Sequence, residues 1–174
     1  MPLEFDYPVP TVYINPYDSV HSIGTQMGTT APASAVWSTA NRAIMIPFRL
    51  FKPATAYKMG IMNGGVVSGN IDMGIYSAAG TLLRSTGATA QLGTDTLQEP
   101  ALSSPVTLGA GYFYMAIAID NNVAQILRRS HNNDICQGMG IVQVASAFPL
   151  PAVATFAAPT GAFVPMIGVK FVPS

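Results

Sequence analysis

The sequence predicts an all-β protein that folds as a single β-sandwich. In residues 71–76 (IDMGIY) the apolar residues Ile71, Met73 and Ile75 alternate with Asp, Gly and Tyr. A period of two is the signature of a strand with one buried face. Short extended stretches of this kind are separated by turns rich in Gly, Pro and Asn. No stretch keeps an apolar repeat of 3.6 residues, which excludes a long amphipathic helix. A series of about eight short strands with such turns indicates a sandwich of the jelly-roll type.

The length favours one domain. A chain of 174 residues and 18.2 kDa buries roughly 70% of the surface that it exposes when unfolded, so it can form a core without covalent staples. The single cysteine, Cys136, cannot form a disulfide within the chain, and we expect it to be a small buried hydrophobe. We expect residues 1–20 to form an extended N-terminal arm and residues 21–174 to form the jelly-roll sandwich.

The arm combines prolines with aromatic and aliphatic residues. Its prolines exclude helix and favour extended backbone, but its apolar content is too high for a disordered tail. Two interpretations remain open: the arm is an edge strand of its own sandwich, or it docks on another subunit. On the second interpretation its aromatic residues bind the partner: Phe5, Tyr7, Tyr13 and Tyr17.

The remaining chain is predicted as strands joined by turns and loops. The turn of the central hairpin contains Gly80, which can adopt the positive φ that a short connection needs. Residues 123–129 are either a strand or one helical turn, whereas residues 21–41, 131–134 and 145–165 are predicted as irregular chain. The predicted strands are residues 43–52, 54–62, 71–76, 81–84, 106–108, 112–120, 141–144 and 165–172, with a further short one near Gln98.

The strand at residues 112–120 (YFYMAIAID) is apolar on both faces. We therefore expect it to be central in its sheet, with one face on the core and the other under a loop or a partner. Trp37, Tyr112 and Tyr114 complete the set of candidate partner-binding residues. For Trp37 we favour a role as a plug of the core; the alternatives are an interface anchor and a platform that stacks on a sugar.

The composition points to an assembled protein. Charged residues make up 9% of the chain, against about 25% in typical soluble domains, and the net charge is zero. A surface with few charges and no net charge tends to associate, so we expect an obligate assembly. The alternative is a free surface made of uncharged polar side chains.

Several classes of partner and activity are disfavoured. Only Arg128-Arg129 forms a basic pair, which is too little for a nucleic-acid partner, and no apolar run reaches the ~18 residues of a membrane span. The first residues lack the basic and apolar regions of a signal peptide, so we expect synthesis in a cytoplasm.

Catalytic motifs are also missing. The only histidines, His21 and His131, lie in predicted loops, and Cys136 near His131 has no family signature around it. One cysteine and two histidines cannot form a Cys/His zinc cage, and turn formation explains the Asn and Asp clusters better than calcium does. A glycosidase needs two carboxylates at defined positions, and nothing in the sequence indicates such a pair. We therefore expect neither an enzyme nor a cofactor.

Four stretches resemble a widespread group of small virion proteins of tailed bacteriophages that have a β-sandwich. They are residues 41–48 (NRAIMIPF), 62–65 (MNGG), 68–76 (SGNIDMGIY) and 111–116 (GYFYMA), and the likeness covers roughly residues 37–120. The resemblance implies a non-enzymatic virion structural protein that is made in the host cytoplasm.

Within that group we favour a capsid decoration (cement) protein. It would bind the outer head lattice through its arm and loops and stabilise it, with the major capsid protein and copies of itself, as a homotrimer or homodimer, as partners. The alternative is a tail-associated domain that binds a receptor or glycan, which would need Trp37, Tyr112 or Tyr114 exposed beside Asn and Asp side chains. A more distant alternative is an accessory domain of a carbohydrate-active enzyme.

Overall fold

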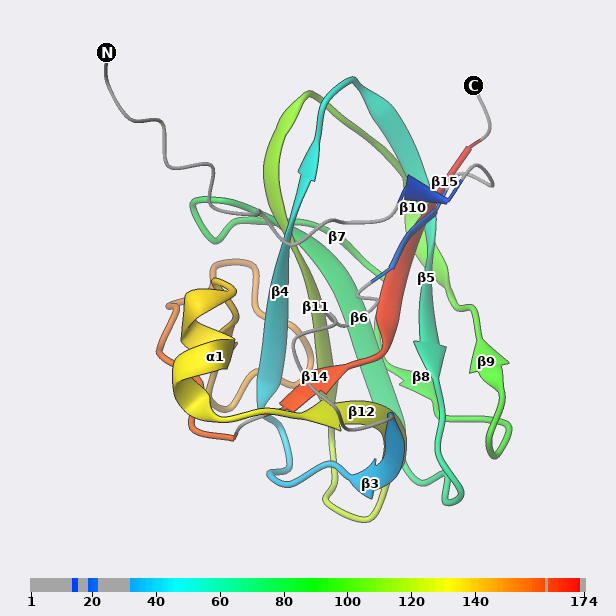
Figure 1. The fold of residues 1–174 in the computed structure, drawn as a ribbon. Coiled ribbons are helices and arrows are strands. Elements are labelled where there is room, and N and C mark those ends of the chain that lie inside the picture. The colour runs from blue at the N-terminus through cyan, green and yellow to red at the C-terminus, as the bar shows by residue number, and fades with distance from the viewer. Residues whose placement is uncertain (1–13, 16–18, 22–31, 162, 173–174) are drawn as a thin grey trace.

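The computed structural model of the protein describes residues 14–15, 19–21, 32–161 and 163–172. Within them the chain is almost entirely β-structure, with one short helix, α1 (Asn133–Gly138) (Figure 1). The prediction of an all-β sandwich is confirmed.

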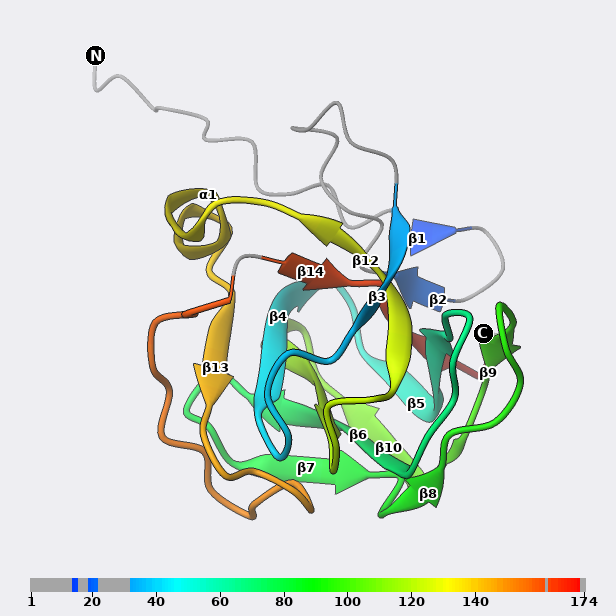
Figure 2. The same cartoon turned by 90° about the horizontal axis from the view of Figure 1, so that it is seen from below.

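Two large antiparallel sheets form the sandwich (Figures 1 and 2). The first sheet has the order β1-β2-β15-β5-β10, with β9 also beside β5, and the second has the order β13-β4-β11-β6-β7, with β8 also beside β6. The first sheet contains β1 (Ile14–Asn15), β2 (Ser19–His21), β15 (Ile167–Phe171), β5 (Ala54–Met62), β10 (Ala101–Leu108) and β9 (Leu97–Gln98). The second contains β13 (Val142–Val144), β4 (Ala43–Leu50), β11 (Gly111–Ile119), β6 (Asn70–Ser77), β7 (Leu82–Ser85) and β8 (Thr89–Ala90).

A third, smaller sheet closes one side of the sandwich. It has the order β14-β12-β3, formed by β14 (Phe163–Pro165), β12 (Gln125–Ser130) and β3 (Ala33–Val36). Because β14 continues along the chain into β15, this sheet is attached directly to the first one (Figure 2).

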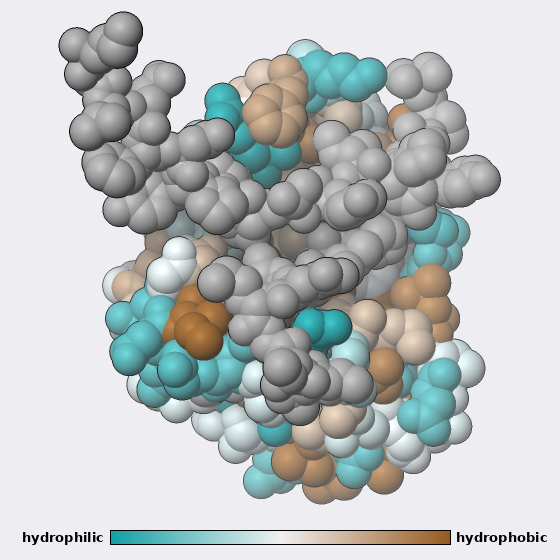
Figure 3. Space-filling model, in the orientation of Figure 1, coloured by the Kyte–Doolittle hydropathy of each residue, from teal (hydrophilic) through white to brown (hydrophobic). Residues whose placement is uncertain are grey.

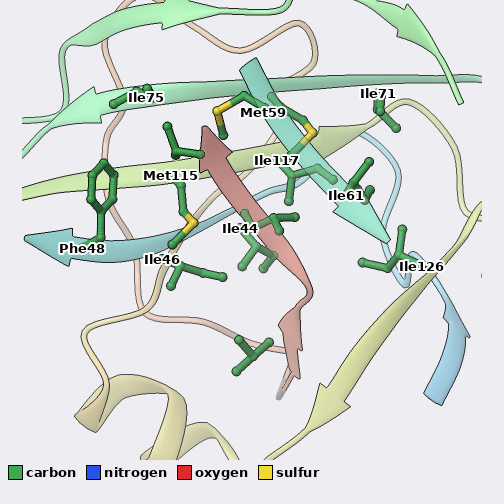
Figure 4. Close-up of a cluster of buried hydrophobic side chains, with 14 of the residues drawn as sticks. Ile44, Ile46, Phe48, Met59, Ile61, Ile71, Ile75, Met115, Ile117 and Ile126 are labelled. Atoms are coloured by element: carbon green, nitrogen blue, oxygen red, sulfur yellow. The ribbon is translucent and has the colours of Figure 1, made fainter. Parts of the chain in front are cut away.

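The main core lies between the two large sheets. Figure 4 shows apolar side chains from β4, β6 and β11 meeting those from β5, with Ile126 of β12 closing one end. Burial of such side chains contributes about 1.5–3 kcal/mol each, which is the main driving force for closing the sandwich. The residues labelled there are Ile44, Ile46, Phe48, Met59, Ile61, Ile71, Ile75, Met115, Ile117 and Ile126.

The outer face of the second sheet carries a second apolar cluster. Ala116 and Ala118 of β11 are fully buried there, beside Met45 of β4 and Tyr76 of β6. The chain that covers them is residues 147–157, which we call the covering segment. Its main chain pairs with both edges of the sheet, at Gly80 and Leu82 beside β7 and at Gln143 in β13. The prediction that a loop or partner covers this face of β11 is met by the protein's own chain.

Two polar side chains fasten the covering segment to β6. Asp72 Oδ2 accepts a hydrogen bond from the Leu150 main-chain N–H at 2.9 Å, and Tyr76 Oη donates to the Pro151 carbonyl at 2.6 Å. Both side chains are almost completely buried. A buried polar group is tolerated only when it is paired. Asp72 and Tyr76 therefore need the main chain of the covering segment as their partner, and their hydrogen bonds fix its position.

The predicted strands agree well with the structure in their positions, but β6 is buried on both faces and not on one face as the alternation at residues 71–76 predicted. Residues 54–62 match β5 at both ends, residues 43–52 correspond to β4, and the hairpin corresponds to β6 and β7. The segment left open at residues 123–129 is a strand, β12. The strand expected at residues 106–108 is longer, because β10 begins at Ala101 and continues through an irregularity in its pairing with β5.

Four elements were not predicted, one of them the two-residue strand β8, which pairs with β6. β3 and β14 lie in stretches expected to be irregular, and both are strands because they pair with β12. α1 overlaps the loop predicted at residues 131–134, where Asn132 caps the helix by accepting a hydrogen bond from the Ile135 N–H.

Part of the predicted arm belongs to the sandwich. β2 pairs with β15 and β1 pairs with β2, so both extend the first sheet of their own chain. The boundary expected at residue 20 therefore falls inside β2. Of the two interpretations of the arm, the described residues correspond to the edge strand.

Substitution at Gly80 tests how the hairpin holds the covering segment. Gly80 has a φ of +86°, and an added Cβ would lie 2.6 Å from the Ala154 carbonyl oxygen. We expect Gly80→Ala to lower the free energy of unfolding by at least about 2 kcal/mol, because it adds this collision to the strain of positive φ. Gly87 has a φ of +68° and open space around it, so Gly87→Ala should cost only about 1 kcal/mol. Equal losses in urea denaturation would contradict this role of the turn.

Candidate functional site

The seven candidate partner-binding residues have different outcomes. Phe5, Tyr7, Tyr13 and Tyr17 lie outside the described residues, so their role stays a prediction. Of the other three, only Tyr112 has a strongly exposed side chain.

Trp37 belongs to the core. Its side chain is 0% exposed, its ring packs edge-on against Phe163 with centroids 5.4 Å apart, and its Nε1–H donates to the Arg42 carbonyl at 3.2 Å. No face of the ring is accessible to a sugar or a partner. Trp37 as an interface anchor or sugar platform is therefore a wrong expectation, and its favoured role as a core plug fits its burial.

Tyr114 is partly buried by the protein's own chain. It lies on the outer face of β11, where its ring contacts Phe156 of the covering segment at a centroid distance of 4.8 Å. The glycan-binding alternative needed Tyr114 exposed, but its exposure is limited because the covering segment, about 40 residues later in the chain, packs over this face.

Tyr112 forms an exposed cluster with Arg49 and Phe51. Tyr112 lies opposite Arg49 in the β4–β11 ladder, and the Arg49 guanidinium carbon is 5.0 Å from the Tyr112 ring centroid and 4.8 Å from that of Phe51. The two rings are 55% and 73% exposed, respectively. We call these three residues the aromatic platform.

The platform lies at one end of the sandwich. Figure 1 shows the β4–β5 and β10–β11 connections together at the top of the view, and the platform belongs to this end. The sequence prediction missed Phe51 because it placed residue 51 inside a strand. β4 ends at Leu50, so Phe51 lies in the turn, where it is not drawn into the core.

The platform has the composition of an interaction site. Large aromatic side chains and arginine are the residue types enriched at the centres of protein interfaces. A cation–π contact at an exposed site stabilises by only about 0.5–1 kcal/mol. This energy does not offset the free-energy cost of exposing two aromatic rings to water. On the face drawn in Figure 3, the described apolar residues otherwise form small groups among hydrophilic ones. The platform is therefore the described feature that best fits a partner.

The polar side chains at the other end of the sandwich are occupied internally. Asp120 accepts hydrogen bonds from the Asn70 main chain and side chain and from Asn121. Burial opposes ionisation of Asp120, but these hydrogen bonds outweigh it and lower its pKa. Asn121 in turn caps the following turn by accepting from the Val123 and Ala124 N–H groups. These groups are part of the scaffold.

A buried amide network ties the loops at this same end. Gln91 Nε2 donates to Asn63 Oδ1 at 3.0 Å and to the Gln125 carbonyl, while its Oε1 accepts from the Ser68 N–H. Asn63 Nδ2 donates to Gln98 Oε1 and to the Leu92 carbonyl. Such a fully paired network fixes loop positions without leaving a free donor for a ligand.

The ionisable groups in the interior do not form a reactive constellation. Burial raises the pKa of Asp72, and its hydrogen bonds from Leu150 and Thr86 only partly oppose this shift. Burial likewise raises the pKa of the Cys136 thiol and lowers that of His131. Within residues 32–161 and 163–172, no three His, Cys, Asp or Glu side chains are grouped to hold a metal ion. No helix in the described chain is long and apolar enough to cross a membrane.

Comparison with known proteins identifies no relative. No protein-family model, no curated protein and no solved structure matches the chain.

Alanine substitutions distinguish Trp37 in the core from Tyr112 in the aromatic platform. Trp37→Ala should lower the free energy of unfolding by about 3–5 kcal/mol, because it leaves a large cavity in the core. Tyr112→Ala should change it by less than about 0.5 kcal/mol, because the ring stands mostly in water. Denaturant titration of both variants measures this, and a small loss for Trp37→Ala would contradict its assignment to the core.

Proposed function

We propose that the protein is a non-enzymatic structural component of a tailed-bacteriophage virion, and specifically a capsid decoration (cement) protein. It would bind the outer head lattice, with the major capsid protein as partner, and would itself form a homotrimer or homodimer. The observation that carries the proposal is the aromatic platform: two exposed rings held by one arginine at the end of a rigid sandwich. The resemblance of residues 37–120 to small phage virion proteins and the low charge content support it.

We further infer that the sandwich is of the jelly-roll type. Eight of its strands pair as the two halves of one long ribbon: β2 with β15, β4 with β11, β5 with β10, and β6 with β7. The first strand of the eight thus pairs with the last, the second with the seventh, and so on to the central hairpin. Rolling such a ribbon gives two Greek keys and the observed sheet orders.

The glycan-binding alternative receives less support. It needs an exposed aromatic ring beside free Asn or Asp side chains, but Tyr112 and Asp120 are at opposite ends of β11. Eight residues of extended strand separate them by roughly 27 Å. The Asn and Asp groups at the far end are also bonded internally. A protein partner, which recognises aromatic and arginine side chains directly, fits the platform better.

Binding to capsids that lack the protein tests the proposal. We expect the double substitution Phe51→Ala/Tyr112→Ala to weaken binding at least about 30-fold, since loss of an interface hot spot costs about 2 kcal/mol or more. The binding isotherm should be measured by co-sedimentation of labelled protein with purified capsids.

Val153→Ala is the matched control. Val153 is 68% exposed but lies in the covering segment, on the outer face of the second sheet, so its removal should leave capsid affinity unchanged. Full affinity of the double variant, with both variants folded by circular dichroism, would contradict the platform as the capsid contact.

A further inference from the structure

The guanidinium group of Arg49 packs against two exposed rings. Its carbon atom lies over the Phe51 ring, 4.8 Å from the centroid, and over the Tyr112 ring, 5.0 Å from the centroid. Arg49 and Tyr112 are opposite each other in the β4–β11 ladder, so the two strands hold their side chains next to each other. The guanidinium group is therefore oriented before a partner arrives, and binding costs little of its conformational freedom.

The hydrogen-bond donors of Arg49 are unused within the described chain. A guanidinium has five N–H donors, and the face of an aromatic ring is only a weak acceptor. The ion pair formed by described residues is Lys170–Glu99, and no described oxygen accepts a hydrogen bond from Arg49. Because Arg49 is itself exposed, the platform offers a fixed cation with free donors beside two aromatic rings.

Among the described residues, the end of the sandwich that carries the platform has positive charges only. Lys52 lies in the same turn as Phe51, is exposed and also has no described carboxylate partner. The described acidic side chains are paired or lie elsewhere: Asp72 is buried under the covering segment, Glu99 pairs with Lys170, Asp95 and Asp120 are at the other end, and Asp134 is in α1. A partner with a negative charge at this place would therefore be complementary to the platform.

We propose that Arg49 binds a carboxylate side chain of the capsid partner, and that Phe51 and Tyr112 contact apolar groups beside it. This inference rests on the proposed capsid contact and specifies its chemistry: an Asp or Glu among apolar residues on the major capsid protein. A guanidinium matches a carboxylate through two parallel N–H···O bonds, which belong to the stronger class of hydrogen bonds. Two positive charges beside two rings favour a protein over nucleic acid, whose phosphates require a larger basic patch.

The two rings strengthen such an ion pair by excluding water. An exposed ion pair contributes little, because water screens both charges and competes for their hydrogen bonds. A partner that covers Phe51 and Tyr112 would enclose the carboxylate and the guanidinium between apolar surfaces. Residues that exclude water around a central charged contact are typical of interface hot spots. The rings therefore shield the contact, and Arg49 selects the charge of the partner.

Zero-length cross-linking to purified capsids that lack the protein tests this inference with the full-length chain. The substitution Arg49→Lys keeps the positive charge and supplies an amine, which a carbodiimide joins to a contacting carboxylate with loss of water. We expect mass spectrometry to identify an amide bond between position 49 and an Asp or Glu of the major capsid protein. Arg129→Lys is the matched control, because Arg129 lies in β12, away from the platform, and should form no such bond.

The Lys170–Glu99 pair is an internal positive control for the reaction, because its charged atoms are 2.5 Å apart at a partly exposed position. If that link forms and the Arg49→Lys variant sediments with capsids, but position 49 gives no link to them, the carboxylate contact is overturned while the capsid contact stands. Failure of the wild-type protein to bind capsids would overturn the proposed function itself, and this inference with it.

Affinity measurements separate the charge of Arg49 from a merely structural role. Relative to the wild type at the same salt concentration, Arg49→Gln should weaken capsid binding at least about 10-fold at low salt and by a smaller factor in 1 M NaCl. The reason is that salt screens the separated charges of the free proteins much more than an enclosed pair. Arg129→Gln removes the same charge elsewhere and should leave the affinity unchanged. An equal loss for Arg49→Gln at both salt concentrations, or no loss, would contradict a carboxylate partner.

Discussion

The fold depends on β11, a strand that is apolar on both faces and therefore has to be covered on both. One face meets the first sheet across the main core, and the other is closed by the covering segment. The ladder with β4 on one side and β6 on the other satisfies its main chain. Because residues 115–119 of this strand are buried on both faces, it fixes the sandwich on one side and the path of residues 147–157 on the other.

The covering segment has a consequence for function. It occupies the outer face of the second sheet, and Asp72 and Tyr76 bind it to β6 through its own main chain. The side chains of that face are therefore covered by the protein's own chain, and the two ends of the sandwich differ in what they offer to a partner. At one end the polar side chains hold the loops together, and at the other the aromatic platform stands in water. The proposed capsid contact follows from this asymmetry.

Strong local patterns made much of the fold predictable. The alternation in β5 and β6, and the glycine turn at Gly80, specify strands and a hairpin independently of the rest of the chain. β3 and β14 have no such pattern, because their small or proline-containing segments become strands only by pairing with β12. The composition of a short segment does not show whether it will pair with a strand that is distant in the sequence.

The candidate site was predictable only in part, for the same reason. Tyr112 was identified because an aromatic residue begins a strand that is apolar throughout, whereas Tyr114 shares that pattern and is partly buried against Phe156. Phe51 was missed, since its exposure depends on where β4 ends.

The central claim is that the protein decorates a phage head, and its copy number in purified virions tests this most directly. Quantitative mass spectrometry would measure the ratio of this protein to the major capsid protein. We predict a ratio comparable to one, or to a simple fraction set by a trimer or dimer on the lattice. A few copies per particle would instead place it on the tail, and its absence from virions would contradict a structural role.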